Sequence, residues 1–267
     1  MKLLCPTDFS NASVNACRWA AKFLDQMGGG QLELLHCINV VSRSVIFLKM
    51  DDVFMEQGKN DLKDLQKKLQ SLAPSVQITS TIVKSDPKQF VPSYVKGKIY
   101  DLIVIGTKGL SSLKEMTIGS VTAFLMDRVD IPLLAVPEKS AFRAVQKIIL
   151  GLDDKINDST IFTTVVHLVN QTGAKLELVH TTKEEDLPLN YQPQFVPELG
   201  DIEFTATILS SQGSITKTLT HYSLDQQADI LVLAHRKRGW FERIFINSLS
   251  REELFVIATP LLILPDA

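Results

Sequence analysis

Three glycines near the middle of the chain have the type and spacing of an anion-binding loop. Gly106 and Gly109 enclose Thr107 and Lys108, and nine residues separate Gly109 from Gly119-Ser120. Glycine lets backbone N–H groups approach a bound anion without a side chain in the way. Gly119-Ser120 also opens a predicted helix, whose first N–H groups carry the positive end of the dipole. This spacing favours a phosphate-bearing ligand over the alternative, in which the glycines only turn a loop.

Other phosphate and metal motifs are absent from the sequence. No Gly-Lys-Ser/Thr follows the glycines, as a Walker loop requires, and no Gly-x-Gly-x-x-Gly of the Rossmann type is present. No group of His, Cys and Asp residues has metal-ligand spacing. His36 and His180 occupy equivalent positions in two similar segments, which favours structural packing over catalysis.

A short apolar strand leads into the glycine segment, and strands and helices alternate on both sides of it. Short apolar runs bounded by turn residues predict buried strands, and capping residues mark the helices between them. The predicted strands are Leu3-Leu4, 32–38, 77–83, 101–105 and 132–136, and the predicted helices are 13–27, 51–72, 86–94 and 120–129. This alternation predicts an α/β fold with a doubly wound parallel sheet and right-handed crossovers.

The second half of the chain repeats the first. Three segments match in order: 2–8 with 147–153, 31–36 with 175–180, and 101–137 with 229–265. The offset falls from 144 to 128, so the second copy lacks 16 residues before its fourth strand. We expect an irregular, proline-containing loop over 183–201 in place of the long second helix. Two tandem domains are predicted, 1–140 and 145–267, joined by a linker over 138–145.

The second copy lacks the glycines. Ala234, Lys237 and Asn247 stand where the first copy has Gly106, Gly109 and Gly119. Ser248 and Asp153 remain, and Arg236 to Arg238 keep the loop cationic. Side chains at the former glycine positions are expected to crowd a phosphate, so we predict one competent site per chain.

Composition limits the class of protein. The chain has 267 residues, of which 45% are hydrophobic and 22% charged, values typical of a packed globular protein. A net charge of −2 gives no reason to expect a nucleic-acid partner. The three cysteines, Cys5, Cys17 and Cys37, argue against a disulfide framework and for a reducing cytoplasm. No segment approaches the roughly 20 apolar residues of a membrane span, so a soluble protein is expected.

Two motifs together resemble the universal stress protein family. They are Pro6-Thr7-Asp8-Phe9-Ser10 after the first strand and Gly106-x2-Gly109-x9-Gly119-Ser120 after the fourth, and the likeness extends over the chain as a tandem of two such domains. The resemblance implies two five-stranded parallel sheets of order 3-2-1-4-5, of the adenine nucleotide alpha-hydrolase-like type. It also implies ATP, with or without Mg, bound beside strands one and four, where the strand order switches.

The resemblance assigns roles to individual residues. It implies that Asp8 contacts the adenosine, that the backbone at Cys37 meets the adenine, and that Pro6, Thr7 and Ile105 line the base pocket. The phosphates are expected at the following residues: Gly106, Lys108, Gly109, Gly119, Ser120, Val121 and Thr122. Ser120 and Thr122 are predicted to donate through their hydroxyls, and Lys108 either reaches a phosphate or points to water. Asp8 has the alternative role of a helix cap, and the Cys37 thiol is expected to have no role of its own.

These residues predict an ATP-binding regulatory protein. No positioned general base is evident, so fast hydrolysis is not expected, and slow ATPase activity stays open. The alternative is a structural or partner-binding module without a ligand, against which the intact glycines argue. The resemblance also implies that the last strands, 132–137 and 260–265, pair to form an internal pseudo-dimer. A further homodimer is not defined by the sequence.

Overall fold

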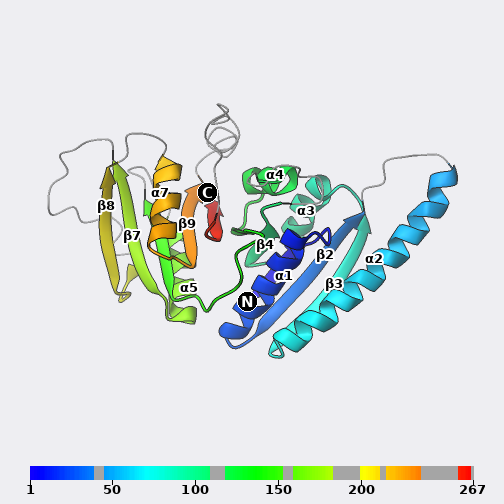
Figure 1. The fold of residues 1–267 in the computed structure, drawn as a ribbon, viewed down its shortest axis with the longest axis horizontal. Coiled ribbons are helices and arrows are strands. Elements are labelled where there is room, and N and C mark those ends of the chain that lie inside the picture. The colour runs from blue at the N-terminus through cyan, green and yellow to red at the C-terminus, as the bar shows by residue number, and fades with distance from the viewer. Residues whose placement is uncertain are drawn as a thin grey trace. The chain divides into compact units, whose positions relative to one another are not determined.

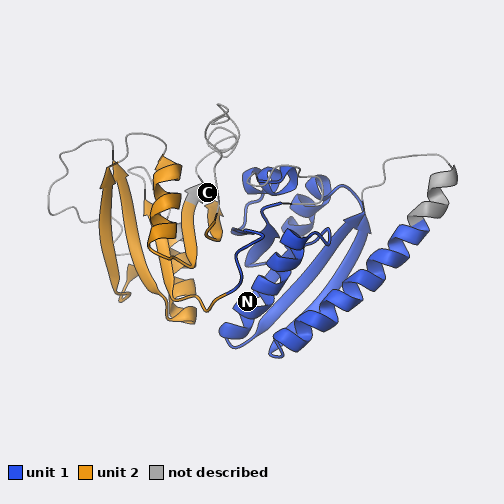
Figure 2. Ribbon diagram, in the orientation of Figure 1, with its two compact units in different colours: residues 1–142 blue, residues 143–267 orange. Residues whose placement is uncertain are grey.

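The chain divides into two compact units, which are described separately here. A computed structural model describes residues 1–38, 45–108, 118–152, 159–182, 199–210, 215–235 and 258–265. The first unit is Met1–Phe142 and the second is Arg143–Ala267 (Figure 2). The division falls inside the predicted linker.

The N-terminal unit is a five-stranded parallel sheet with helices on both faces (Figure 1). Its strands are β1 (Lys2–Pro6), β2 (Gly30–Ile38), β3 (Val76–Lys84), β4 (Leu102–Gly106) and β5 (Leu133–Val136). Its helices are α1 (Asn11–Gln26), α2 (Val45–Leu72), α3 (Pro87–Lys96) and α4 (Ser120–Arg128). The strand order is β3-β2-β1-β4-β5 and every pair is parallel. Helix α1 contacts α2, and α3 contacts α4. The predicted fold class and strand order are confirmed.

Local sequence explains where the helices of this unit begin and end. Ser10 is the N-cap of α1, and its hydroxyl accepts a hydrogen bond from the Ser13 N–H at 3.3 Å. Gly28 and Gly29, both with positive φ, follow its last turn. Asp86 caps α3 in the same way, and its carboxylate accepts from the Lys88 N–H at 2.7 Å.

Helix α2 ends at the predicted residue but differs from the prediction in its start and in one residue of its apolar stripe. It begins at Val45, six residues before the predicted start. Of the predicted apolar stripe, Leu62, Leu65 and Leu69 are buried, but Leu72 is 44% exposed at the last turn. The stripe therefore holds where the helix lies on β3 and fails where the helix ends.

The C-terminal unit has the same topology. Its elements are β6 (Lys147–Leu152), α5 (Ser159–Thr172), β7 (Lys175–Thr182), β8 (Phe204–Ser210), α7 (Ile215–Asp225), β9 (Ile230–His235) and β10 (Leu261–Pro265). Its strand order is β10-β9-β6-β7-β8, all parallel, so β6 corresponds to β1 and β9 to β4. The predicted internal repeat is confirmed. Most of the predicted irregular loop, residues 183–198, lies outside the described residues.

Each unit buries one glutamate in its second strand, and hydroxyl and amine donors surround it. In the N-terminal unit, Glu33 accepts hydrogen bonds from Thr81 at 2.8 Å, Tyr94 at 2.5 Å and Tyr100 at 2.7 Å. Lys98 lies 3.8 Å from the same carboxylate. Burying an unpaired carboxylate costs free energy, and the hydrogen bonds from these donors offset that cost at Glu33.

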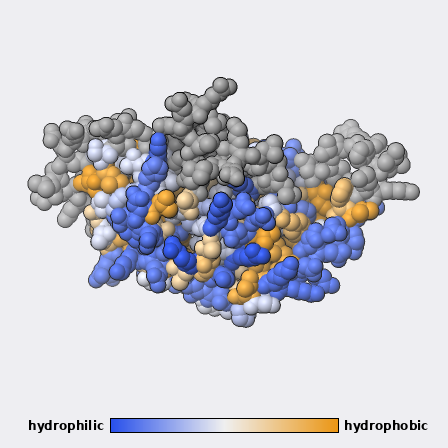
Figure 3. Space-filling model, in the orientation of Figure 1, coloured by the Kyte–Doolittle hydropathy of each residue, from blue (hydrophilic) through white to orange (hydrophobic). Residues whose placement is uncertain are grey.

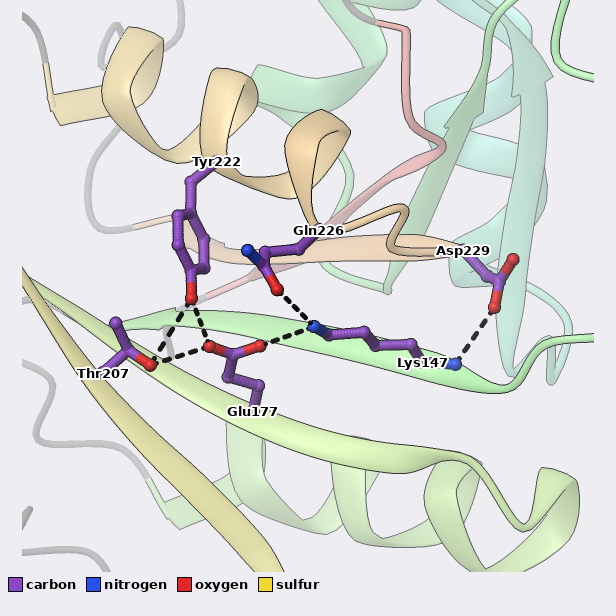
Figure 4. Close-up of polar contacts among 6 residues, drawn as sticks. All are labelled: Lys147, Glu177, Thr207, Tyr222, Gln226 and Asp229. Atoms are coloured by element: carbon purple, nitrogen blue, oxygen red, sulfur yellow. Dashed lines mark hydrogen bonds and ion pairs between the residues drawn. The ribbon is translucent and has the colours of Figure 1, made fainter.

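The C-terminal unit keeps the threonine and the first tyrosine of this cluster and changes the other donors (Figure 4). Glu177 accepts from Thr207 at 2.8 Å and from Tyr222 at 2.5 Å, as Glu33 does from its threonine and tyrosine. Ala228 stands at the sequence position of Tyr100, and the Lys147 ammonium takes the third place, 2.9 Å from the Glu177 carboxylate. The amide oxygen of Gln226 holds the same ammonium at 3.1 Å. The two units thus stabilise the same buried charge with different donors.

The surface visible in Figure 3 is mostly hydrophilic, with hydrophobic side chains gathered in separate patches. Within the described ranges, no helix combines the length and apolar character that spanning a bilayer requires.

Candidate functional site

A pocket opens at the carboxyl ends of β1, β2 and β4, beside the first turn of α4. Its volume is about 600 Å³ when counted out to its open mouth. The predicted site residues that line it are Pro6, Thr7, Asp8, Cys37, Ile105, Gly106, Lys108, Gly119, Ser120, Val121 and Thr122. Gly109, the one other predicted residue, lies outside the described residues. The sheet order changes direction at β1 and β4, and open α/β sheets bind their ligands at this point.

Three further residues line the pocket that sequence reasoning did not name: Ser13, Leu35 and Pro87. Leu35 pairs with Pro6 at the end of β2, and Pro87 is the first residue of α3. Ser13 lies in the first turn of α1, where its hydroxyl is 3.0 Å from that of Thr7. The place of Ser13 could have been predicted from the sequence, because a side chain three residues after an N-cap faces the preceding loop.

One wall of the pocket combines apolar side chains with a backbone edge. Leu35, Ile105 and Pro6 supply apolar surface. The Thr7 N–H donates to the Leu35 carbonyl at 2.8 Å, so Leu35 presents its backbone groups toward β1. Alternate residues of a parallel strand face the same neighbour, so Cys37 presents its N–H and C=O to the same side, beyond the last residue of β1. One donor and one acceptor beside an apolar slot suit the edge of a planar heterocyclic base.

The Cys37 side chain is not a reactive thiol. Burial, assisted by the negative charge of Asp86, raises the pKa of Cys37 to about 12. The thiol is therefore protonated at neutral pH and does not act as a nucleophile. The contact that we predict for Cys37 is therefore made by its backbone.

The opposite wall is the N-terminus of α4. Gly119 is its N-cap and provides no side-chain hydrogen bond, and the first bond within the helix is from the Ala123 N–H to the Gly119 carbonyl at 2.9 Å. The N–H groups of Ser120, Val121 and Thr122 thus have no partner within the helix, and they carry its positive dipole end into the pocket.

Two of the predicted phosphate contacts are already used within the protein. The Thr122 hydroxyl donates to the Gly106 carbonyl at 2.8 Å, and the Gly119 N–H donates to the Thr107 carbonyl at 2.6 Å. The prediction that Thr122 donates its hydroxyl to a phosphate does not fit this geometry. Its hydroxyl instead fixes α4 to the end of β4, and the Ser120 hydroxyl and the helix N–H groups remain as candidate donors.

Gly106 has a packing role that the sequence did not indicate. A Cβ at this position would lie 2.7 Å from the backbone carbonyl of Ala12 and 2.9 Å from the backbone nitrogen of Ser13. Such distances are too short for any side chain, and both neighbours are backbone atoms of α1. The glycine lets α1 pack against the end of β4, and in this way brings Ser13 to the pocket.

Asp8 stabilises the loop between β1 and α1. One of its carboxylate oxygens accepts from the Ser10 N–H at 3.1 Å and from the Ser10 hydroxyl at 2.6 Å. Ser10, in turn, is the N-cap of α1. Asp8 therefore supports the cap rather than forming it, and it also lines the pocket.

In the described part of the corresponding region, the C-terminal unit has leucine side chains. Gly151 occupies the position of Pro6, and a Cβ there would lie 2.8 Å from the side chains of both Leu219 and Leu233. Leucine side chains thus pack over the end of β6, where the first unit has its pocket. The residues Asp153, Lys237, Asn247 and Ser248, on which the predicted loss of the second site depended, lie outside the described residues.

Comparisons with known proteins agree with this fold. A model described as the universal stress protein family matches residues 1–137. A universal stress protein of Methanocaldococcus jannaschii is 24% identical over 159 residues, which cover 52% of this chain and 96% of that protein. The universal stress protein YxiE of Bacillus subtilis is 30% identical over 145 residues, 51% of this chain and 97% of its own. The crystal structure of a universal stress protein from Archaeoglobus fulgidus covers 100% of this chain and 98% of its own, with a TM-score of 0.76 and 18% identity.

Proposed function

The chain belongs to the universal stress protein family, and from this premise we propose that its N-terminal unit binds ATP and acts as a nucleotide-dependent regulatory module. The base lies in the slot between Pro6, Leu35 and Ile105, and the Cys37 backbone reads its edge. The phosphates lie at the N-terminus of α4.

One observation carries the proposal. A single pocket joins an apolar slot with a backbone donor–acceptor pair to a helix N-terminus that has no side-chain cap. The slot alone would fit many apolar ligands, and a helix N-terminus alone would fit any small anion. Both within one pocket fit a ligand that is a flat base at one end and an anion at the other.

The C-terminal unit is proposed to support the first rather than to bind nucleotide itself. Leu219 and Leu233 lie against Gly151, which corresponds to Pro6, and we propose that they leave no base slot there. We further propose that the last strands of the two units pair into an internal pseudo-dimer, on the strength of their apolar sequences. Within the described residues, no three His, Cys, Asp or Glu side chains gather as metal ligands. Magnesium is therefore expected to arrive with the phosphate oxygens of ATP.

The protein is proposed to act in the cytoplasm. Cys5 and Cys17 are free thiols with their sulfur atoms 3.2 Å apart. A reducing compartment keeps such a pair from oxidising.

Calorimetric titration of the full chain with ATP and magnesium tests the proposal. We expect close to one site per chain. Ser120→Pro is expected to weaken ATP binding about tenfold, because it removes one N–H and one hydroxyl that face the phosphates. Proline is tolerated at the first position of a helix, and Gly119 already has the extended conformation that precedes proline (φ −65°, ψ 150°). Adenosine, which has no phosphates, should bind the variant as it binds the natural protein.

The matched control is Ile215→Pro, which places proline at the first residue of α7 in the other unit. It should leave ATP binding unchanged. Two equal sites per chain would contradict the proposed role of the C-terminal unit, and absence of ATP binding would overturn the proposed function as a whole.

A further inference from the structure

One histidine beside the pocket makes a hydrogen bond that the proposed ligand contacts do not account for. His36 is on β2, next to Cys37, and its Nδ1 atom lies 2.8 Å from the Thr7 carbonyl oxygen. Because a carbonyl only accepts hydrogen bonds, Nδ1 carries the hydrogen and donates. Thr7 is the residue that follows β1 and lines the pocket.

This hydrogen bond takes the place of the next bond of the sheet. The Thr7 N–H is still bonded to the Leu35 carbonyl, as in a regular parallel ladder. If the ladder continued, the Thr7 carbonyl would accept from the Cys37 N–H. The His36 side chain occupies that carbonyl instead, which leaves the Cys37 N–H available toward the pocket.

Phe9 and Gly58 are close neighbours of the imidazole. The Phe9 ring lies 4.6 Å from it, centroid to centroid, and Phe9 has φ 61°, an unusual backbone conformation for a residue with a side chain. A Cβ at Gly58 of α2 would lie 2.7 Å from the Ile82 side chain and 3.1 Å from the His36 ring. Glycine in the middle of α2 thus gives space to both side chains, at a position where most residues would favour the helix more.

We propose that His36 is the positioning residue for the base end of the pocket. By donating to the Thr7 carbonyl, it ends the β1–β2 ladder at Thr7 and keeps the Cys37 backbone edge open for the base. The proposal rests on the proposed function for its ligand, but its claim about the loop stands on the hydrogen bond alone. The corresponding residue of the second unit, His180, is 4% exposed.

Two variants separate the hydrogen bond from the ring. His36→Asn keeps a donor near the position of Nδ1 and loses the ring. His36→Phe keeps a ring against Phe9 and loses the donor. Since a neutral hydrogen bond contributes on the order of 1 kcal/mol, we expect His36→Phe to weaken adenosine and ATP binding about fivefold. His36→Asn should stay within about twofold of the natural protein by the same reasoning.

Two readouts distinguish positioning from general stability. Inorganic tripolyphosphate, used as a competitor, should bind both variants as it binds the natural protein, because it has no base. In the nucleotide-free protein, amide hydrogen exchange over residues 7–10 should be faster in His36→Phe and unchanged in His36→Asn. These amides are protected now, since the Phe9 N–H donates to the Thr7 hydroxyl and the Ser10 N–H donates to Asp8.

The outcomes are separable from those for the proposed function. If the natural protein binds no adenine nucleotide, the function fails, and hydrogen exchange still decides whether His36 fixes the loop. Unchanged exchange and unchanged affinity in His36→Phe would overturn the inference. So would equal impairment of both variants, which would assign the effect to the ring, or an equal loss of tripolyphosphate binding.

Discussion

Glu33→Ala is expected to lower the free energy of unfolding of the N-terminal unit by about 3 kcal/mol, because it leaves buried hydroxyl donors without their acceptor. Glu33 is 7% exposed and Tyr100 is 5% exposed. Water therefore does not readily replace the lost carboxylate. Thr81 and Tyr94 lose an acceptor at the same time.

Urea denaturation followed by tryptophan fluorescence measures this loss. Trp19 is buried in α1 against Phe23 and Phe142, so its emission reports on the N-terminal unit. The chain has two tryptophans, and a Trp240→Phe background leaves Trp19 as the only emitter. Glu138→Ala, at an exposed position of the same unit, is the matched control and should change the midpoint little. A Glu33→Ala midpoint equal to that of Glu138→Ala would contradict the cluster.

The same cluster predicts a dependence of this loss on pH. Burial alone would raise the pKa of Glu33, but hydrogen bonds from Tyr94, Tyr100 and Thr81 and the charge of Lys98 bring it below its ordinary value of 4.5. A carboxylate with a lowered folded pKa stabilises the protein fully above its unfolded pKa. That contribution is lost as the pH falls through the folded pKa. The stability gap between the natural protein and Glu33→Ala should thus be constant above about pH 5.5 and narrow below pH 4.5.

The glutamate clusters show what sequence reasoning did not reach. The alignment of 31–36 with 175–180 placed Glu33 opposite Glu177, each inside an apolar strand. A charge at the same buried position in two copies was a signal that both need partners. The partners could not be predicted from the sequence, because they come from different elements. In the second unit, Lys147 takes the place that Tyr100 has in the first.

Most helix ends followed from local rules, and the strand order followed from the family resemblance. Alternating apolar runs and caps such as Ser10 and Asp86 act within a few residues, and the elements that they predict were confirmed in the described residues. The roles of individual residues could not be predicted by the same rules. The Thr122 hydroxyl is used by the protein itself, and Gly106 faces α1, because both depend on how elements distant in the sequence pack.

Gly106→Ala is the second large effect that we expect. The added Cβ would meet the backbone of Ala12 and Ser13 at 2.7 to 2.9 Å, and neither can move without shifting the first turn of α1. Overpacking against backbone typically costs about 1–3 kcal/mol, and we expect a loss near 3 kcal/mol in the unfolding free energy. ATP binding should fall as well, since Ser13 and Ile105 both line the pocket.

The control distinguishes this packing role from direct contact with an anion. Gly97→Ala in the same unit adds a Cβ whose nearest neighbours lie 3.8 Å away, so urea denaturation should show little change. If Gly106→Ala were as stable as Gly97→Ala and lost only ATP binding, the glycine would serve the phosphate directly. Loss of both stability and binding would assign it to the contact between α1 and β4. The corresponding residue of the C-terminal unit is Ala234 in β9, so the end of that strand leaves room for a Cβ that the N-terminal unit does not allow at Gly106.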